Sequence, residues 1–305
     1  MELSPDDPID AGSTIGESRD DVAPGTAGAS SHAGLATRSR DIAVSWRPTG
    51  RMLEVRRYGI SRVYTVKASG ARTVATSVDG RFVLSIEHES GPKTNERLWA
   101  IHDLKAVDAE HVICRLVDSF EASGSTFRLR AIPSRAVPYS IWARWNEGRP
   151  VSLRRVAYGL ALALSALHER GLYARYLPPL SVCVDDGAPL LCDFPALVRG
   201  GYMVGAVGSA PYAAPETVRG NHRACEKSDV WCIGALLVDA ILVSSEEYAE
   251  GQSASHDYDA SLWIERACEA VEGWPDIVYV VRNCTALISI RRCTVDRILT
   301  HMVHT

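Results

Sequence analysis

The chain has 305 residues, of which 46% are hydrophobic and 23% charged, and this is the composition of a folded globular protein. Thirty-three basic and 37 acidic residues give a net charge of −4, which offers no basic field for a phosphate backbone, so we expect no nucleic-acid partner. The longest apolar runs, 156–167 and 230–243, fall short of the roughly 20 residues that cross a bilayer, and no export signal begins the sequence. We therefore expect an intracellular protein, in the cytoplasm or nucleus, without a membrane span.

Residues 1–45 are predicted to be a disordered acidic tail. Up to about residue 40 this segment consists mainly of Gly, Ala, Ser, Thr, Pro and Asp, with seven acidic residues and no aromatic one. A segment of this composition buries too little apolar surface to offset the entropy lost on ordering.

Short β-type runs separated by turn signals follow, and they predict a β-rich N-terminal lobe over residues 52–132. Between the third and fourth runs, apolar residues spaced three apart at Leu98, Ile101 and Leu104 predict one helix. Pro133 and Pro138 then interrupt the pattern, so we place the boundary between two lobes at residue 133. The expected strands are residues 63–66, 73–78, 82–86, 112–117 and 127–132.

Residues 133–305 are predicted to form a larger, α-helical lobe. The pattern over 152–170 is strongly helical, and Gly171 stands where a helix C-cap is expected. A Gly- and Pro-rich stretch at 195–215 shows no periodicity, and the chain is helical in character from residue 228 onward. Strands followed by helices indicate an α+β fold with a small β-rich lobe before a larger helical one.

The eight cysteines are dispersed along the chain. They form no C-x-x-C pair, and no histidine stands at metal-ligand spacing from them. We interpret them as reduced and mostly buried apolar side chains.

Five motifs of the second lobe occur in a fixed order. Leu-His-Glu-Arg-Gly at 167–171 leads to Leu-Pro-Pro at 177–179, Leu-Cys-Asp-Phe at 191–194, Gly-Ser-Ala-Pro-Tyr-Ala-Ala-Pro-Glu at 208–216 and Asp-Val-Trp at 229–231. In order and spacing they resemble the H-R-D-L-K-P-x-N, D-F-G, A-P-E and S-D-V-W-x-x-G motifs of eukaryotic-type protein kinases. The resemblance covers about residues 52–304 and implies a two-lobed kinase-like fold, whose active members use ATP and Mg²⁺.

The end of the chain supports the resemblance. Arg-Cys-Thr-Val-Asp-Arg-Ile-Leu-Thr-His at 292–301 is similar to the closing R-P-T-A-x-x-L-L-x-H segment of kinases, whose arginine pairs with the glutamate of A-P-E. The resemblance therefore implies an ion pair between Glu216 and Arg292, and the alternative is two exposed charges.

A narrower resemblance rests on two further patterns. Arg-Leu-Val-Asp-Ser-Phe at 115–120 and Ile-Pro at 132–133, at the expected hinge, are most similar to the serine/threonine kinases of the short unique region of alphaherpesvirus genomes. This resemblance would place the protein in a host cell.

The resemblance puts unusual residues at the catalytic positions of the second lobe. The His, Arg and Asp of the catalytic loop fall on Ala174, Arg175 and Tyr176, and a phenol with a pKa near 10 is a poor acceptor for a hydroxyl proton. The loop lysine falls on Pro178, and the metal-binding asparagine falls on Ser181, a shorter and weaker oxygen ligand.

The first lobe lacks the phosphate-binding lysine of the resemblance. That position falls on Ser85, in Phe-Val-Leu-Ser at 82–85. Glu96, on the expected helix, then has no cation unless Lys67 or Lys93 substitutes.

The phosphate-covering loop of the resemblance falls on residues 56–63 and ends at Val63. No glycine is in register there, and glycine serves at this place because backbone amides approach phosphate closely. Arg56 and Tyr58 are expected to obstruct that approach.

Asp193 is retained at the D-F-G aspartate, so it is either a magnesium ligand or a structural residue. Pro195 replaces the glycine of that motif and fixes the backbone. The candidate nucleotide-binding residues are Val63, Glu96 and Asp193. The residues to which the resemblance gives structural roles are Arg175, Phe194, Glu216, Asp229 and Arg292.

These replacements predict a pseudokinase that binds another protein, requires no cofactor and has lost phosphotransfer or retains very little. The alternative is an active serine/threonine kinase that transfers the γ-phosphate of ATP with relocated catalytic groups, and a third possibility is a decayed paralogue without a binding role. Candidate anchors for the partner, with core packing as the alternative, are Trp142, Trp145, Trp263 and Trp274.

Overall fold

The computed structural model describes residues 42–46, 52–57, 60–68, 72–88, 111–146, 149–201, 203–220, 222–243 and 259–303. Several predicted features therefore lie outside the described residues. They are residues 1–41 of the tail, Tyr58, Lys93, Glu96 and the helix with Leu98, Ile101 and Leu104.

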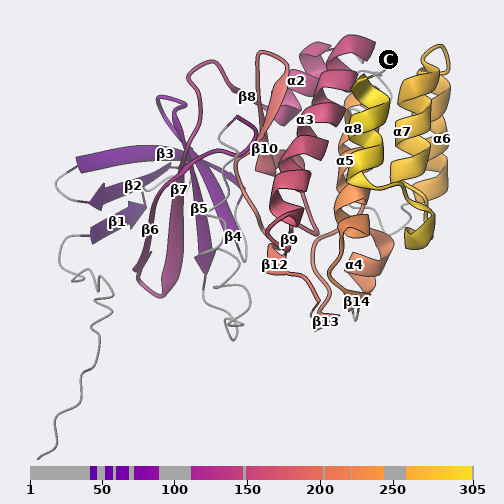
Figure 1. Cartoon of the computed structure of the whole chain (residues 1–305). Coiled ribbons are helices and arrows are strands. Elements are labelled where there is room, and N and C mark those ends of the chain that lie inside the picture. The colour runs from indigo at the N-terminus through magenta and orange to yellow at the C-terminus, as the bar shows by residue number, and fades with distance from the viewer. Residues whose placement is uncertain are drawn as a thin grey trace, which may run out of the picture. The chain divides into compact units, whose positions relative to one another are not determined.

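The N-terminal lobe is a seven-stranded antiparallel sheet in the order β1-β2-β3-β4-β5-β7-β6 (Figure 1). Each strand pairs with the next along the chain except that β5 pairs with β7, which places β6 at one edge. The strands are β1 (Ile42–Trp46), β2 (Met52–Arg57), β3 (Ile60–Ala68), β4 (Arg72–Ser77), β5 (Phe82–His88), β6 (Leu116–Ala122) and β7 (Ser125–Ala131).

Two boundaries in this lobe differ from the sequence prediction. β1 begins at Ile42, inside the predicted tail of residues 1–45, because the strand pairs with β2 and its apolar residues Ile42 and Val44 pack on the lobe's core. The strand predicted at 112–117 begins only at Leu116. The apolar residues before it are buried against the second lobe instead, where the Cys114 amide donates to the Leu191 carbonyl at 2.9 Å.

The sheet curls until its two edges approach each other. β1 contacts β6, and an ion pair joins the neighbouring strand β2 to β6, with Arg57 Nε 3.1 Å from Asp118 Oδ2. Apolar residues fill the interior, where the Phe120 and Phe127 rings stack with centroids 5.0 Å apart. The curled sheet therefore has a small core of its own.

The C-terminal lobe is helical and is built around α3 and α5 (Figure 1). Its helices are α2 (Tyr139–Asn146), α3 (Pro150–His168), α4 (Pro215–Arg219), α5 (Glu226–Leu242), α6 (Ala260–Ala270), α7 (Pro275–Cys284) and α8 (Val295–Val303), with 3₁₀ turns η2 (Pro179–Ser181) and η4 (Ser289–Arg291). Its short strands are β8 (Val137–Pro138), β9 (Leu172–Tyr173), β10 (Val182–Asp185), β11 (Ala188–Leu191), β12 (Val198–Arg199), β13 (Met203–Val204) and β14 (His222–Arg223).

The two central helices follow from their sequences. α3 begins at Pro150, two residues before the predicted start, because proline is favoured in the first turn of a helix. It ends before Gly171, whose φ of 67° suits glycine. Every residue of α5 from Ser228 to Leu242 is buried, as expected for a helix that is apolar on all sides.

A third apolar cluster joins the two lobes. It consists of buried residues from the sheet and from the β10–β11 hairpin with its following residue, together with Cys114, which precedes β6, and Ile132, which follows β7. The members are Val74, Val83, Cys114, Ile132, Cys183, Leu190 and Cys192. Among the described residues, no helix is both long and apolar enough to cross a membrane.

Candidate functional site: a buried aspartate between two lobes

Asp193 lies between the lobes and is hydrogen-bonded to Ser85. Successive residues of a strand point to opposite faces, so Leu84 of β5 faces the core of the curled sheet and Ser85 faces the second lobe. Ser85 Oγ donates to Asp193 Oδ1 at 2.6 Å, and the two residues are only 2% and 5% exposed. The residue that the resemblance places at the lysine position therefore contacts the aspartate that it places in the D-F-G motif, through a neutral hydroxyl.

A buried arginine accompanies this pair, and the sequence analysis missed it. Arg130 of β7 is 4% exposed, its Nη1 donates to the Cys114 carbonyl at 2.9 Å, and its Cζ lies 5.1 Å from the centre of the Phe194 ring. Burial lowers the pKa of Arg130, and the negative charge of Asp193 opposes that shift. The sequence did contain a signal for this buried charge, because two arginines, Arg128 and Arg130, stand in a β-type run whose other residues are mostly uncharged.

Asp229 organises the loop that the resemblance identifies with the catalytic loop. Its carboxylate accepts hydrogen bonds from the backbone amides of Ala174 at 3.0 Å and Arg175 at 2.5 Å, and His168 Nε2 lies 2.8 Å from Oδ2. Arg175 has a φ of 64°, and its Nη2 donates to the Gly205 carbonyl at 2.5 Å. The buried start of α5 therefore holds this loop in a defined conformation.

Tyr176 occupies the place predicted for the proton acceptor and packs against the segment before α4. It forms a β-bridge with Ala213, and a Cβ atom added at Gly208 would lie 2.6 Å from the Tyr176 ring. Ser181 is buried, its amide donates to the Pro178 carbonyl at 2.8 Å, and its Oγ has no hydrogen-bond partner among the described residues. Packing of the Tyr176 ring and the backbone bonds of both residues therefore hold the loop in place.

Val63, at which the predicted covering loop ends, lies on β3. In the sheet β3 is separated from β5 by β4, and residues 69–71, which connect β3 to β4, lie outside the described residues. The assignment of the covering loop to residues 56–63 stays a prediction, because Tyr58 and Gly59 lie outside the described residues.

The predicted pair between Glu216 and Arg292 is present. Arg292 Nη1 and Nη2 donate to the two Glu216 carboxylate oxygens at 2.6 and 2.9 Å, and the arginine also donates to the carbonyls of Ala286 and Lys227. Burial alone would raise the pKa of Glu216, but the hydrogen bonds and charge of Arg292 outweigh it and hold that pKa below its usual value. This clamp joins α4 to the segment before α8.

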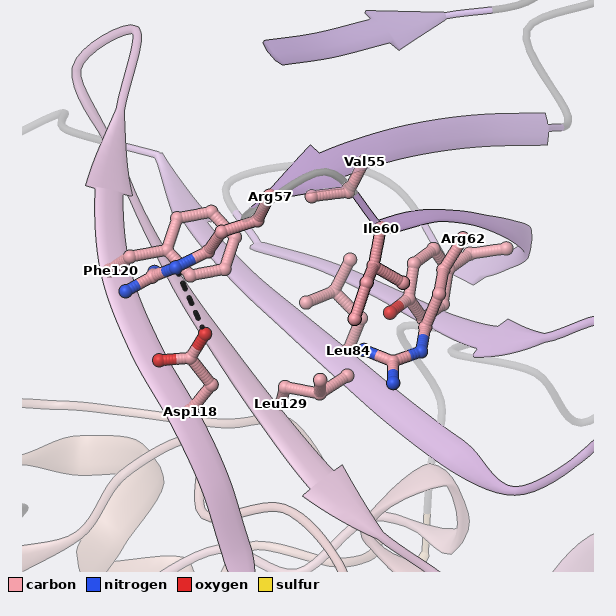
Figure 2. Close-up of a pocket in the computed structure, with 9 residues that line it drawn as sticks. Val55, Arg57, Ile60, Arg62, Leu84, Asp118, Phe120 and Leu129 are labelled. Carbon is pink, nitrogen blue, oxygen red and sulfur yellow. Dashed lines mark ion pairs between the residues drawn. The ribbon is translucent and has the colours of Figure 1, made fainter. Parts of the chain in front are cut away.

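A hollow of about 70 Å³ lies on the other face of the sheet (Figure 2). Leu84 contributes to it, so it is separated from Asp193 by the thickness of β5. In Figure 2, Arg57 lies along Phe120 and reaches Asp118, while Ile60 covers the apolar floor. The hollow is therefore not the space between the lobes where the resemblance places a nucleotide.

The β-rich sheet followed by a helical lobe defines a mixed α/β, two-lobed fold of the protein-kinase-like type. In sequence, the chain is similar to curated serine/threonine protein kinases. CBL-interacting protein kinase 4 of Oryza sativa subsp. japonica is 30% identical over 205 residues, 62% of this chain and 42% of that protein. Serine/threonine-protein kinase AfsK of Streptomyces griseus is 27% identical over 238 residues, 72% of this chain and 26% of that protein.

A third relative extends the comparison. CBL-interacting serine/threonine-protein kinase 7 of Arabidopsis thaliana is 21% identical over 214 residues, 66% of this chain and 46% of that protein. The chain thus spans less than half the length of each of these relatives. No protein-family profile matches the chain.

Proposed function

We propose that the protein is a pseudokinase, which acts by binding another protein and has lost phosphotransfer or retains very little. The observation that carries this proposal is the buried hydrogen bond between Ser85 and Asp193. Magnesium binding needs an ionised carboxylate with room for water molecules, and positioning of a γ-phosphate needs fixed positive charge beside it. The aspartate here is 5% exposed and accepts a neutral hydroxyl at the position of the lysine.

The described residues do not fit a magnesium nucleotide between the lobes. The valines of β4 and β5 and the residues of the β10–β11 hairpin pack together into the buried cluster that joins the lobes, which leaves these side chains closed to solvent. The Tyr176 ring packs where a proton acceptor is expected. We therefore propose that the protein requires no cofactor.

One observation favours the alternative, an active serine/threonine kinase with relocated charges. Arg130 is a buried cation, and its electrostatic interaction with Asp193 raises the pKa of the arginine against the effect of burial. If the lobes separate, this guanidinium is the described cation best placed to meet a phosphate beside Asp193. The alternative therefore assigns the lost lysine's role to Arg130.

The test combines nucleotide binding and phosphotransfer in the purified full chain. We expect no magnesium-dependent rise in melting temperature at millimolar ATP. Such a rise would be easy to detect, because a ligand present at 100 times its Kd stabilises the folded protein by about 2.7 kcal/mol. We also expect no transfer of labelled phosphate to the chain or to generic protein substrates. Turnover that Asp193→Ala and Arg130→Met both abolish, while Arg282→Met leaves it unchanged, would establish the alternative.

The exposed end of α2 is the best candidate for the contact with a protein partner. Of the tryptophans proposed as anchors, Trp142 and Trp263 are buried at 9% and 4% exposure, whereas Trp145 is 70% exposed. Ile141, one helical turn before it, is 39% exposed and shares its face. Loss of a captured partner in Trp145→Ala, with retention in Val303→Ala, would support this surface and would argue against a decayed paralogue.

We also propose a relationship to alphaherpesvirus kinases and a location in the cytoplasm or nucleus. The narrower resemblance to alphaherpesvirus kinases rests on residues 115–120 and 132–133 alone, and a location in the cytoplasm or nucleus rests on composition. Localisation of the tagged full chain in cells tests the second.

A further inference from the structure

Two cysteines meet where α7 ends and the chain returns toward α8. Cys284 is the last residue of α7. The Cys293 amide donates to the carbonyl of Asn283, the residue before Cys284, at 3.0 Å. This backbone bond holds the two side chains together, with their Sγ atoms 3.9 Å apart. A disulfide requires about 2.05 Å between the sulfurs, so a relative movement of roughly 2 Å would join them.

The two thiols differ in access and in charge. Cys284 is fully buried, at 0% exposure, whereas Cys293 is partly exposed. A hydrogen bond from Cys284 lowers the pKa of the Cys293 thiol, and Lys227 and Arg297 lower it further against the effect of burial. Lys227 Nζ also donates to the Cys293 carbonyl at 3.0 Å, which keeps its positive charge nearby. Cys293 is thus the more acidic and more accessible member of the pair.

We propose that Cys293 and Cys284 form an oxidation site at which a peroxide generates an intramolecular disulfide. The Cys293 thiolate attacks one peroxide oxygen, the O–O bond breaks, and the products are a sulfenic acid and hydroxide. The Cys284 sulfur then attacks the sulfenic sulfur, so that the S–S bond forms and the S–O bond breaks. The Cys284 proton leaves with the departing hydroxide as water. In total two thiols are oxidised, and one hydrogen peroxide molecule is reduced to two water molecules.

The disulfide would act on the clamp described above. Arg292 directly precedes Cys293, and its guanidinium holds Glu216 of α4. A covalent bond from the end of α7 to Cys293 would fix the segment that carries this arginine and restrict the unfolded chain. Oxidation should therefore raise the melting temperature.

A second pair of cysteines provides an internal control. Cys183 and Cys192 have the same sequence separation of nine residues as the proposed pair, and their Sγ atoms are closer, at 3.6 Å. Both are buried, at 5% and 0% exposure, in the cluster that joins the lobes. If distance alone decided reactivity, this pair would oxidise first. A hydrogen bond with Cys192 also lowers the pKa of the Cys183 thiol, so the two pairs differ in access and in the positive charges of Lys227 and Arg297 beside Cys293. If these two differences decide reactivity, the Cys284–Cys293 pair oxidises first.

The experiment treats the reduced full chain with increasing hydrogen peroxide, alkylates the remaining thiols and digests the protein with trypsin. Cleavage after Arg282, Arg291, Arg292 and Arg297 leaves the two cysteines on separate peptides, 283–291 and 293–297, so that the disulfide appears as one cross-linked species. We expect that species to form before any Cys183–Cys192 disulfide, and we expect the melting temperature to rise with it.

Two cysteine variants test which thiols form the disulfide. Cys293→Ser should abolish the cross-linked peptide and the rise in melting temperature, and Cys183→Ser should preserve both. Earlier oxidation of Cys183 and Cys192 in the unmodified protein would overturn the proposal. Conversion of Cys293 to sulfinic acid, with Cys284 recovered as an alkylated and therefore unoxidised thiol, would also overturn it. This measurement is made on the unmodified protein and does not depend on the folding of a variant.

Discussion

Replacing Arg292 with alanine tests the clamp that holds the C-terminal segment to α4. The arginine side chain is 0% exposed, while the Glu216 side chain retains 22%. The substitution removes both hydrogen bonds to the carboxylate and also the bonds to the carbonyls of Ala286 and Lys227. It leaves the Glu216 carboxylate with the Ser228 hydroxyl, which donates to it at 3.1 Å.

The magnitude follows from this geometry. Removing one member of a buried ion pair costs about 3 to 5 kcal/mol, because the remaining charge has lost its compensation. The orphaned carbonyls add to the loss, but water reaches part of Glu216 and relieves its charge. The two corrections oppose each other, so we expect Arg292→Ala to lower the free energy of unfolding by about 3 kcal/mol.

Urea denaturation followed by tryptophan fluorescence and by circular dichroism measures this loss. A double-mutant cycle with Glu216→Ala isolates the coupling between the two side chains. Arg282→Ala is the matched control, because its ion pair with Glu265 is exposed on both sides, and we expect no measurable change. A loss below about 1 kcal/mol for Arg292→Ala, or a coupling near zero, would refute the structural role of the clamp.

Three further outcomes are expected. Gly234→Ala should destabilise the protein by about 1 to 2 kcal/mol in thermal unfolding, because the added methyl group would lie 2.5 Å from the Thr285 side chain and this overpacking outweighs the gain in helix propensity. Gly273→Ala is the control and should not destabilise it, since nothing lies within 4 Å of the added Cβ. The stabilisation that depends on ionised Glu216 should be complete above its usual pKa of 4.5 and should disappear as the pH falls through the lower folded pKa. In urea denaturation, Glu216→Gln should therefore lower the free energy of unfolding more at pH 7 than at pH 3. Tyr176→Asp alone, or with Ser85→Lys, should give no phosphotransfer in a radiolabel assay, since the catalytic groups act as a unit; turnover in the single variant would contradict this.

Much of the architecture was accessible from local sequence. The alternation and turn signals of 73–78 and 82–86 correspond to β4 and β5, and the helical pattern of 152–170 lies two residues from both ends of α3. The Glu216–Arg292 pair was implied by two short motifs far apart in the chain. Such features depend on periodicity or on motifs, and both can be read without coordinates.

The interactions around Asp193 could not be predicted in the same way. The Ser85–Asp193 hydrogen bond joins residues 108 positions apart, and Arg130 reaches its partners only because β7 pairs with β5. Sequence pattern places Arg130 in a strand but does not say which face it occupies, because both faces of this strand are buried. The sequence nevertheless indicated a buried ionic interaction, because a charged residue in a strand that is buried on both faces requires a nearby countercharge.

The curl of the N-terminal sheet has a consequence for assembly. An open sheet exposes a row of backbone amides and carbonyls at each edge, to which a strand of another molecule can add. Here the edge strands β1 and β6 face each other, and the Arg57–Asp118 ion pair lies beside the gap between them. Disrupting that ion pair should therefore expose two backbone edges together, and self-association of Asp118→Ala at high concentration would reveal them.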